Sequence, residues 1–141
     1  MLFVCKGALM TSGAPAETAY ERLGGEPVLR ALVRSFYGYM DALPEASVIR
    51  SMHADELDNA EDKLFKFLSG WLGGPNLYWE EFGHPRLRMR HFPFSIGIPE
   101  RDQWMACMNR ALEDTIPESE FRERLSLAFA QTANHMINRP E

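Results

Sequence analysis

The segment Gly83–Gly97 reads Gly-His-Pro-Arg-Leu-Arg-Met-Arg-His-Phe-Pro-Phe-Ser-Ile-Gly, and its interpretation decides the fold expected for the whole chain. Proline is favoured at the first position of a helix, so Pro85 can begin one. Pro93 disfavours helical geometry in the residue before it, so the helix must end by Phe92. The sequence therefore predicts a helix of about two turns with His91 near its end. Such a short helix, bounded by prolines, contributes little to a core and is suited to orienting one side chain.

His91 has two possible roles. A protonated histidine at a helix C-terminus interacts favourably with the helix dipole, and this role suits most histidines in such a position. Alternatively, His91 is an axial ligand of haem iron, for which histidine is a standard ligand. Arg86 and Arg90 are four residues apart and would share a helix face, and arginine binds carboxylates such as the haem propionates well. A solvated basic surface explains the same arginines, so these residues alone leave both roles open.

Length and composition describe an acidic globular domain. The 141 residues fit one domain, and 45% hydrophobic and 25% charged residues are ordinary proportions. A net charge of −5 argues against a nucleic-acid-binding surface. Cys5 and Cys107 have no disulfide-framework or metal-site spacing and form no covalent haem-attachment motif, so we expect a reducing cytoplasm. No apolar run reaches the roughly 18 residues of a membrane span, so no membrane partner is expected.

The chain is predicted to be all helical. Glycine and proline separate segments with helical periodicity, and no alternating segment is long enough for a confident strand. Thr18 and Glu21 form a capping-box pattern before a short helix that ends at Gly24-Gly25. Pro27 opens a second helix, whose apolar positions fit one face, namely Val28, Leu29, Leu32, Val33, Phe36 and Met40. The later predicted segments are a short turn from Pro44 to Arg50, a helix over 57–72, an irregular aromatic stretch over 76–82, a helix from Pro99 and a helix from Pro117. The last helix is expected to end at Asn138, Arg139 and Pro140, and its apolar stripe, with Thr132 on the same face, consists of Phe121, Leu125, Ala128, Phe129 and Met136.

Several side chains outside Gly83–Gly97 have an ordinary structural explanation. Ala60, Leu64, Phe67 and Trp71 recur at steps of four, three and four, which places them on one helix face and is explained by core packing. Trp104 is explained by packing in an amphipathic helix, although its N–H needs a partner when buried. By the same reasoning Tyr37 lies at the edge of the core, His53 and Lys63 are solvated, His84 is a capping or packing residue, and Cys107 is a small buried apolar side chain.

A set of short motifs in a fixed order resembles the second group of truncated haemoglobins. Each motif is weak alone, but the ordered set is specific and covers roughly residues 18 to 136. The motifs are Leu23-Gly24-Gly25, Phe36-Tyr37, Gly73-Gly74-Pro75, His84-Pro85, Leu87-Arg88, Arg90-His91-x-Pro93-Phe94, Arg101-Asp102-x-Trp104 and Cys107-Met108.

The resemblance implies a globin-like, all-α fold, the truncated two-on-two helical sandwich around haem b (iron protoporphyrin IX). Residues 16–141 would form the globin domain, and residues 1–15 a flexible N-terminal extension. His91 would be the proximal ligand of the iron. The side chains that the resemblance places against the haem are Lys63, Leu64, Phe67, Tyr78, Leu87, Arg90, Phe94, Trp104 and Met108.

The resemblance also implies the residues of the distal pocket, where a ligand of the iron would lie. These are Tyr37, His53, Ala60 and Trp104. The methyl group of Ala60 offers no hydrogen bond, so polarity must come from the other three. Loop length varies in the family, so Met52 is an alternative to His53.

The function implied is reversible binding of dioxygen, and of carbon monoxide, nitric oxide or cyanide, at a five-coordinate iron, as in oxygen transport. The alternative is a haem oxidoreductase, either a nitric-oxide dioxygenase or a peroxidase-like enzyme. An enzyme would need an external reductase, because this chain contains no flavin- or nicotinamide-binding fingerprint. A homodimer is possible. A haem-free helical interaction module is the remaining alternative, and a visible absorption spectrum distinguishes it.

Overall fold

The computed structural model describes residues 17–139, which form helices joined by short loops and contain no β-strand. This confirms the predicted all-α fold. The predicted extension over residues 1–15 and Cys5 lie outside the described residues. In chain order the helices are α2 (Ala19–Leu23), α3 (Gly25–Ala42), the 3-10 helix η1 (Pro44–Ala46), α4 (Ser47–Ser51), α5 (Asp58–Trp71), α6 (Leu77–Phe82), α7 (Leu87–His91), α8 (Ile98–Thr115) and α9 (Ser119–His135).

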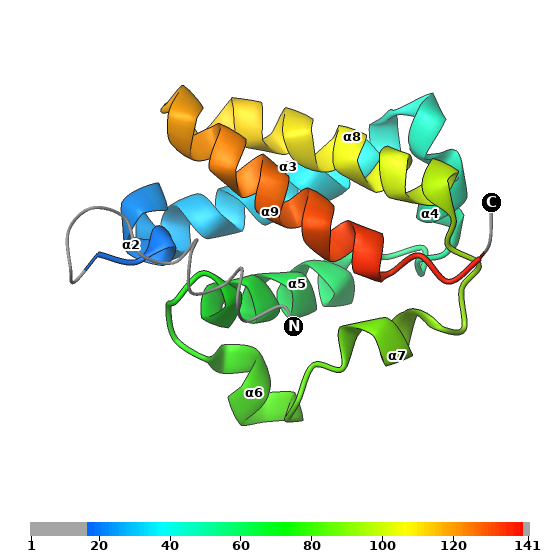
Figure 1. The fold of residues 1–141 in the computed structure, drawn as a ribbon, viewed down its shortest axis with the longest axis horizontal. Helices are drawn as coiled ribbons and strands as arrows, with labels where there is room; N and C mark the ends of the chain where they lie inside the picture. Colours follow the sequence, from blue (N-terminus) through cyan, green and yellow to red (C-terminus); the bar gives the residue numbers. More distant parts are fainter. Residues whose placement is uncertain (1–16, 140–141) are drawn as a thin grey trace.

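The core lies where the long helices meet. Helix α3 packs against α8 and α5, and α8 packs against α9 (Figure 1). The apolar face predicted for the second helix is buried as expected, with Leu29, Leu32 and Phe36 fully inaccessible to solvent. Burying a side chain of this size stabilises the fold by about 1.5–3 kcal/mol. These contacts build a rigid frame on one side of α5, while α6 and α7 lie on its other side (Figure 1).

The first turn of the chain follows the predicted capping box. The Thr18 hydroxyl accepts a hydrogen bond from the Glu21 N–H at 3.1 Å, and the Glu21 carboxylate accepts one from the Thr18 N–H at 3.0 Å. Helix α3 begins at Gly25, two residues before the predicted start at Pro27. Gly24 and Gly25 make the change of direction together, with φ at 121° and 74°, conformations that favour glycine, so the next helix can follow at once.

The aromatic stretch predicted to be irregular is helical, and that prediction is wrong. Residues 77–82 form α6, with the Glu80 N–H bonded to the Asn76 carbonyl at 3.1 Å. Packing against α5 explains the helix, because buried Tyr78 meets Phe67 edge to face at 6.3 Å. Six residues are too few to show a helical period in the sequence.

Helix α7 is shorter than predicted and begins at Leu87. Arg86 has φ at 47°, in the left-handed region, so neither it nor Pro85 belongs to the helix. The prediction that Arg86 and Arg90 share a helix face is therefore wrong. His84 does not cap α7, whose N-cap is Arg86 and which has no side-chain cap. Its Nδ1 accepts a hydrogen bond from the Arg86 N–H at 3.0 Å, and its ring packs against Trp79 at 4.7 Å, as the packing alternative predicted. The predicted helix starts at Pro99 and Pro117 each fall within two residues of the observed starts at Ile98 and Ser119.

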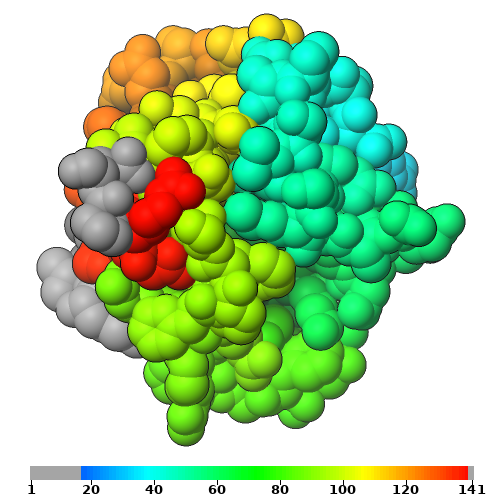
Figure 2. Space-filling view, turned by 90° about the vertical axis from the view of Figure 1, so that its right-hand side faces the viewer, coloured from blue at the N-terminus to red at the C-terminus, as the bar shows by residue number. Residues whose placement is uncertain are grey.

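No helix among residues 17–139 packs extensively against α7. The segment that follows α9 holds it instead, and Figure 2 shows this red segment against the yellow-green residues after α7. One Arg88 nitrogen, Nη1, donates hydrogen bonds to the carbonyls of His135 and Ile137 at 2.6 and 3.0 Å. Within the same described range, no helix is long and apolar enough to cross a membrane.

Candidate functional site

A cavity of about 580 Å³ lies between α5, α7, α8 and α9. Its lining is mainly apolar, with a few polar and charged side chains. The four residues predicted to share a face of α5, Ala60, Leu64, Phe67 and Trp71, all line it. Of the other residues singled out in the sequence, the lining includes Tyr37, Met52, His53, Lys63, Tyr78, Leu87, His91, Phe94 and Trp104.

His91 reaches this cavity from the last turn of α7. Its Nδ1 lies 2.6 Å from the carbonyl oxygen of Leu87, one turn earlier on the same helix. A carbonyl can only accept, so Nδ1 carries a proton, and in the neutral ring Nε2 then keeps its lone pair. This is the arrangement found in metal-binding histidines, whose second nitrogen donates to a backbone carbonyl or a carboxylate. The neutral His91 ring therefore has a lone pair on Nε2 with which it can bind a metal.

Asn138 anchors the backbone on both sides of the α7 C-terminus. Its Nδ2 donates to the His91 carbonyl at 3.1 Å and to the Phe94 carbonyl at 2.9 Å. Its Oδ1 accepts from the Ile96 N–H at 2.9 Å. The sequence suggested only that Asn138 ends the last helix, because nothing local connects it with residues more than forty positions earlier.

Tyr37, His53 and Trp104 line the part of the cavity formed by α3, α4 and α8. The Tyr37 ring meets Phe36 edge to face at 4.9 Å and His53 at 5.7 Å. Burial raises the pKa of Tyr37 well above its ordinary value, so the hydroxyl stays protonated and can donate at neutral pH. His53 Nδ1 lies 2.8 Å from the Ile49 carbonyl, which leaves Nε2 for other contacts. Met52 and His53 both reach the cavity, so these alternatives are not exclusive.

Lys63 supplies a cation at the cavity lining. Its Nζ lies 5.5 Å from the centre of the Phe82 ring, and it makes no ion pair with any described residue. Glu100 also lines the cavity, but its carboxylate is engaged. It accepts from the Gly97 N–H at 2.7 Å and from the Arg139 guanidinium at 2.8 Å. Lys63 is therefore free to pair with an incoming anion.

Two residues predicted to contact the cofactor do not line the cavity. Arg90 donates through Nε to the Pro85 carbonyl at 2.8 Å, and its guanidinium lies 6.0 Å from the Tyr78 ring. Met108 is fully buried in the core between the long helices.

Sequence reasoning missed the contribution of α9. The cavity lining includes four residues of the apolar stripe or its neighbours on this helix, none of which was predicted to contact the cofactor, namely Phe129, Thr132, Ala133 and Met136. The available signal was Thr132, a hydroxyl-bearing residue within that stripe. Among the described residues, no three His, Cys, Asp or Glu side chains lie close enough to hold a metal ion by themselves.

Comparison with known proteins agrees with this architecture. The family model described as bacterial-like globin matches residues 18–138. The chain is 38% identical to the group 2 truncated hemoglobin YjbI of Bacillus subtilis over 92% of this chain and 95% of that protein. It is 45% identical to the cold-adapted truncated hemoglobin of Pseudoalteromonas haloplanktis, covering 88% of this chain and 100% of that one, with a TM-score of 0.86. It is also 43% identical to the group II 2-on-2 hemoglobin of Agrobacterium tumefaciens, covering 92% of this chain and 100% of that one, with a TM-score of 0.86. The chain therefore belongs to the bacterial-like globin family and, within it, to the group II truncated haemoglobins.

Proposed function

We propose that the cavity of about 580 Å³ binds haem b, with His91 as the proximal ligand of a five-coordinate iron. The observation that carries this proposal is the hydrogen bond from His91 Nδ1 to the Leu87 carbonyl at 2.6 Å. In the neutral ring it leaves the Nε2 lone pair available on a side chain that lines the cavity, as an iron ligand requires. Membership of the globin family, whose cofactor is haem, supports the same assignment.

The lining suits a porphyrin with two carboxylates. Apolar side chains from α5, α8 and α9 would cover its faces, and the unpaired ammonium of Lys63 would approach a propionate. Arg90 makes a backbone hydrogen bond through Nε, so only its terminal nitrogens could reach the other propionate. The further residues proposed to contact the haem are Leu64, Phe67, Tyr78, Leu87, Phe94 and Trp104.

When bound, the haem supplies an iron with one open position, and we propose that it takes dioxygen and other diatomic ligands reversibly. Donors that converge on bound dioxygen stabilise its partial negative charge. In this chain the Tyr37 hydroxyl, the Trp104 N–H and His53 are the proposed donors, and Ala60 contributes none. One neutral hydrogen bond contributes about 0.5–1.5 kcal/mol. Two or three such bonds would slow ligand release about tenfold or more.

Absorption spectroscopy of the reduced protein, with and without carbon monoxide, tests haem binding directly. We expect a haem spectrum that shifts when carbon monoxide is added. His91→Ala should lose the normal iron spectrum and most of the haem, while the exposed His135→Ala should behave like the parent. Normal haem content and an unchanged spectrum in His91→Ala would show that another residue holds the iron.

The distal residues are tested by the dissociation rate of dioxygen. We expect Tyr37→Phe and Trp104→Phe each to release dioxygen faster, because each removes one donor while keeping an aromatic ring. Unchanged rates in both variants would exclude these two residues from ligand stabilisation without affecting the assignment of His91.

A further inference from the structure

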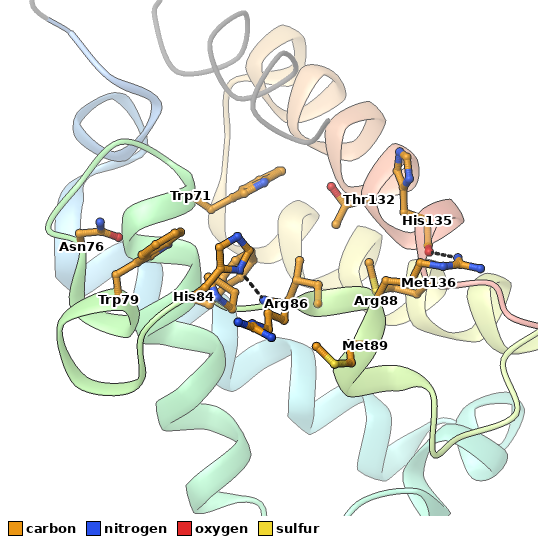
Figure 3. Close-up of a pocket in the computed structure, with 13 residues that line it drawn as sticks. Trp71, Asn76, Trp79, His84, Arg86, Arg88, Met89, Thr132, His135 and Met136 are labelled. Atoms are coloured by element: carbon orange, nitrogen blue, oxygen red, sulfur yellow. Dashed lines mark hydrogen bonds between the residues drawn. The ribbon is translucent and has the colours of Figure 1, made fainter.

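A second cavity, of about 270 Å³, lies between the end of α5, the segment from Asn76 to Met89 and the end of α9 (Figure 3). The two cavities adjoin, because five side chains line both, namely Phe67, Trp71, Leu87, Thr132 and Met136. The remaining lining belongs to the smaller cavity alone and includes Trp79, His84, Arg86 and Met89. Part of the smaller cavity is therefore lined by residues that are not proposed to contact the haem.

Trp71 brings an unsatisfied hydrogen-bond donor to this cavity. Its side chain is 2% exposed, and its Nε1 has no hydrogen-bond partner among the described residues. The indole projects into the space between His84 and Thr132 (Figure 3). Leaving a buried donor unpaired is unfavourable, so an acceptor oxygen placed there would be stabilised.

The charged groups around the smaller cavity are all basic. Its lining contains Arg86, Arg88, His84 and His135 and no aspartate or glutamate, in a chain with 20 acidic residues and a net charge of −5. Neither Arg86 nor Arg88 makes an ion pair with any described residue. His84 Nδ1 already accepts from the Arg86 N–H, so the neutral ring offers an Nε2–H donor. This lining favours an anion.

The rest of the lining is apolar and aromatic, with Trp79, Leu87 and Met89 among its members. Small-molecule sites typically measure about 300–1,000 Å³, and this cavity, at about 270 Å³, lies just below that range and suits only a small ligand. We propose that it binds a small organic carboxylate with an apolar body and a second acceptor oxygen. The carboxylate is bound by Arg86 and its basic neighbours, and the second oxygen accepts from Trp71 Nε1.

Three probes of matched length separate these contributions. The compound 5-oxohexanoate carries both the carboxylate and the second oxygen, hexanoate carries only the carboxylate, and 2-hexanone carries only the carbonyl. We expect 5-oxohexanoate to bind about tenfold or more tightly than either of the others, because each loses one interaction with a buried or charged donor. Equal affinity of hexanoate and 5-oxohexanoate would overturn the role of Trp71.

The measurement is the indole N–H resonance of Trp71 in ¹⁵N-labelled protein, which has only three tryptophans. We expect this resonance to move on titration with 5-oxohexanoate, both in the protein as purified and in the hemin-loaded, reduced, carbon monoxide-bound form. Loss of binding when hemin is added would show that the probe occupies the haem cavity and would overturn the proposal. The Trp71 resonance reports probe binding whether or not haem is bound, and the absorption spectrum reports haem binding, so failure of the haem assignment would be seen separately.

The matched variants are Arg86→Gln and Arg124→Gln. Arg124 pairs with Glu120 at 2.9 Å on the surface of α9 and does not line the cavity. We expect Arg86→Gln to lower the affinity for 5-oxohexanoate about tenfold and to leave the affinity for 2-hexanone unchanged. Arg124→Gln should change neither affinity. Arg86→Lys should restore part of the affinity because it restores the charge. Equal effects of Arg86→Gln and Arg124→Gln would overturn the proposal.

Discussion

Asn138 is the side chain whose removal should most directly release α7 from the rest of the molecule. It makes three hydrogen bonds, two to the carbonyls of His91 and Phe94 and one from the Ile96 N–H. Asn138→Ala deletes all three without adding bulk. Because no helix among residues 17–139 packs extensively on α7, few other contacts can compensate.

The size of the effect follows from these three bonds. At about 0.5–1.5 kcal/mol each, they could contribute about 1.5–4.5 kcal/mol. Phe94 is exposed, so water can replace the hydrogen bond that its carbonyl loses. We therefore expect Asn138→Ala to lower the free energy of opening α7 by about 2 kcal/mol. Since about 1.4 kcal/mol is a factor of ten, local opening of α7 should become roughly thirtyfold more frequent.

Hydrogen exchange followed by mass spectrometry measures this opening in the peptide that covers residues 84–97. We expect amide protection there to fall by roughly thirtyfold in Asn138→Ala, with little change in α3 or α8. Hemin should also transfer faster from this variant to an acceptor protein. The matched control is Asn109→Ala, which removes a single hydrogen bond to Ser126 at the surface and should leave residues 84–97 unchanged.

Equal hydrogen exchange of residues 84–97 in Asn138→Ala, Asn109→Ala and the parent would contradict the role of Asn138 in holding α7. That result would mean that α7 is held by contacts other than the segment after α9. Faster hemin transfer without faster exchange would locate the effect in the haem cavity instead of in α7.

Four further predictions concern stability and reactivity. Gly74→Ala should lower the free energy of unfolding by about 1–3 kcal/mol in urea titrations, because its Cβ would lie 2.5 Å from the Tyr20 ring. Gly38→Ala, with nothing within 4 Å of the added Cβ in mid-helix, should raise it by about 0.5–1 kcal/mol. Burial raises the pKa of Cys107 to about 11, so iodoacetamide should label the Cys107 peptide slowly at neutral pH and rapidly in urea. Burial also raises the pKa of Tyr37, so above about pH 10 the unfolded chain binds fewer protons than the native protein and stability falls as pH rises. Tyr37→Phe should lose less stability than the parent over that range, and an equal loss would contradict the assignment.

Long periodic segments were predicted well because their burial repeats over several turns. The face of α5 that carries Ala60, Leu64, Phe67 and Trp71 was identified from spacing alone, and all four residues line the larger cavity. The buried face of α3 was found in the same way. In helices of 14 and 18 residues, the period averages over enough positions to outweigh any one exception.

Short segments gave no comparable signal. Helix α6 has six residues and depends on contacts of Tyr78 with Phe67 on α5, which the local pattern cannot reveal. The start of α7 was misplaced because Arg86 is left-handed, and an arginine gives no warning of a positive φ. The smaller cavity could not be predicted either, because it forms only where Trp71, Arg86 and Met136 come together from three distant segments.

Helix α7 shows why a sequence can name a candidate ligand without determining its orientation. An isolated helix of five residues is far below the length that is stable in water, so α7 must be held by tertiary contacts. Asn138 and Arg88 provide them, and the partners of Asn138 lie more than forty residues away in the chain. The hydrogen bond between His91 and Leu87 exists only while that turn is formed. The proposed binding of iron by His91 would therefore depend on Asn138 as much as on the residues beside His91, and substitutions of Asn138 should be tested for their effect on haem binding.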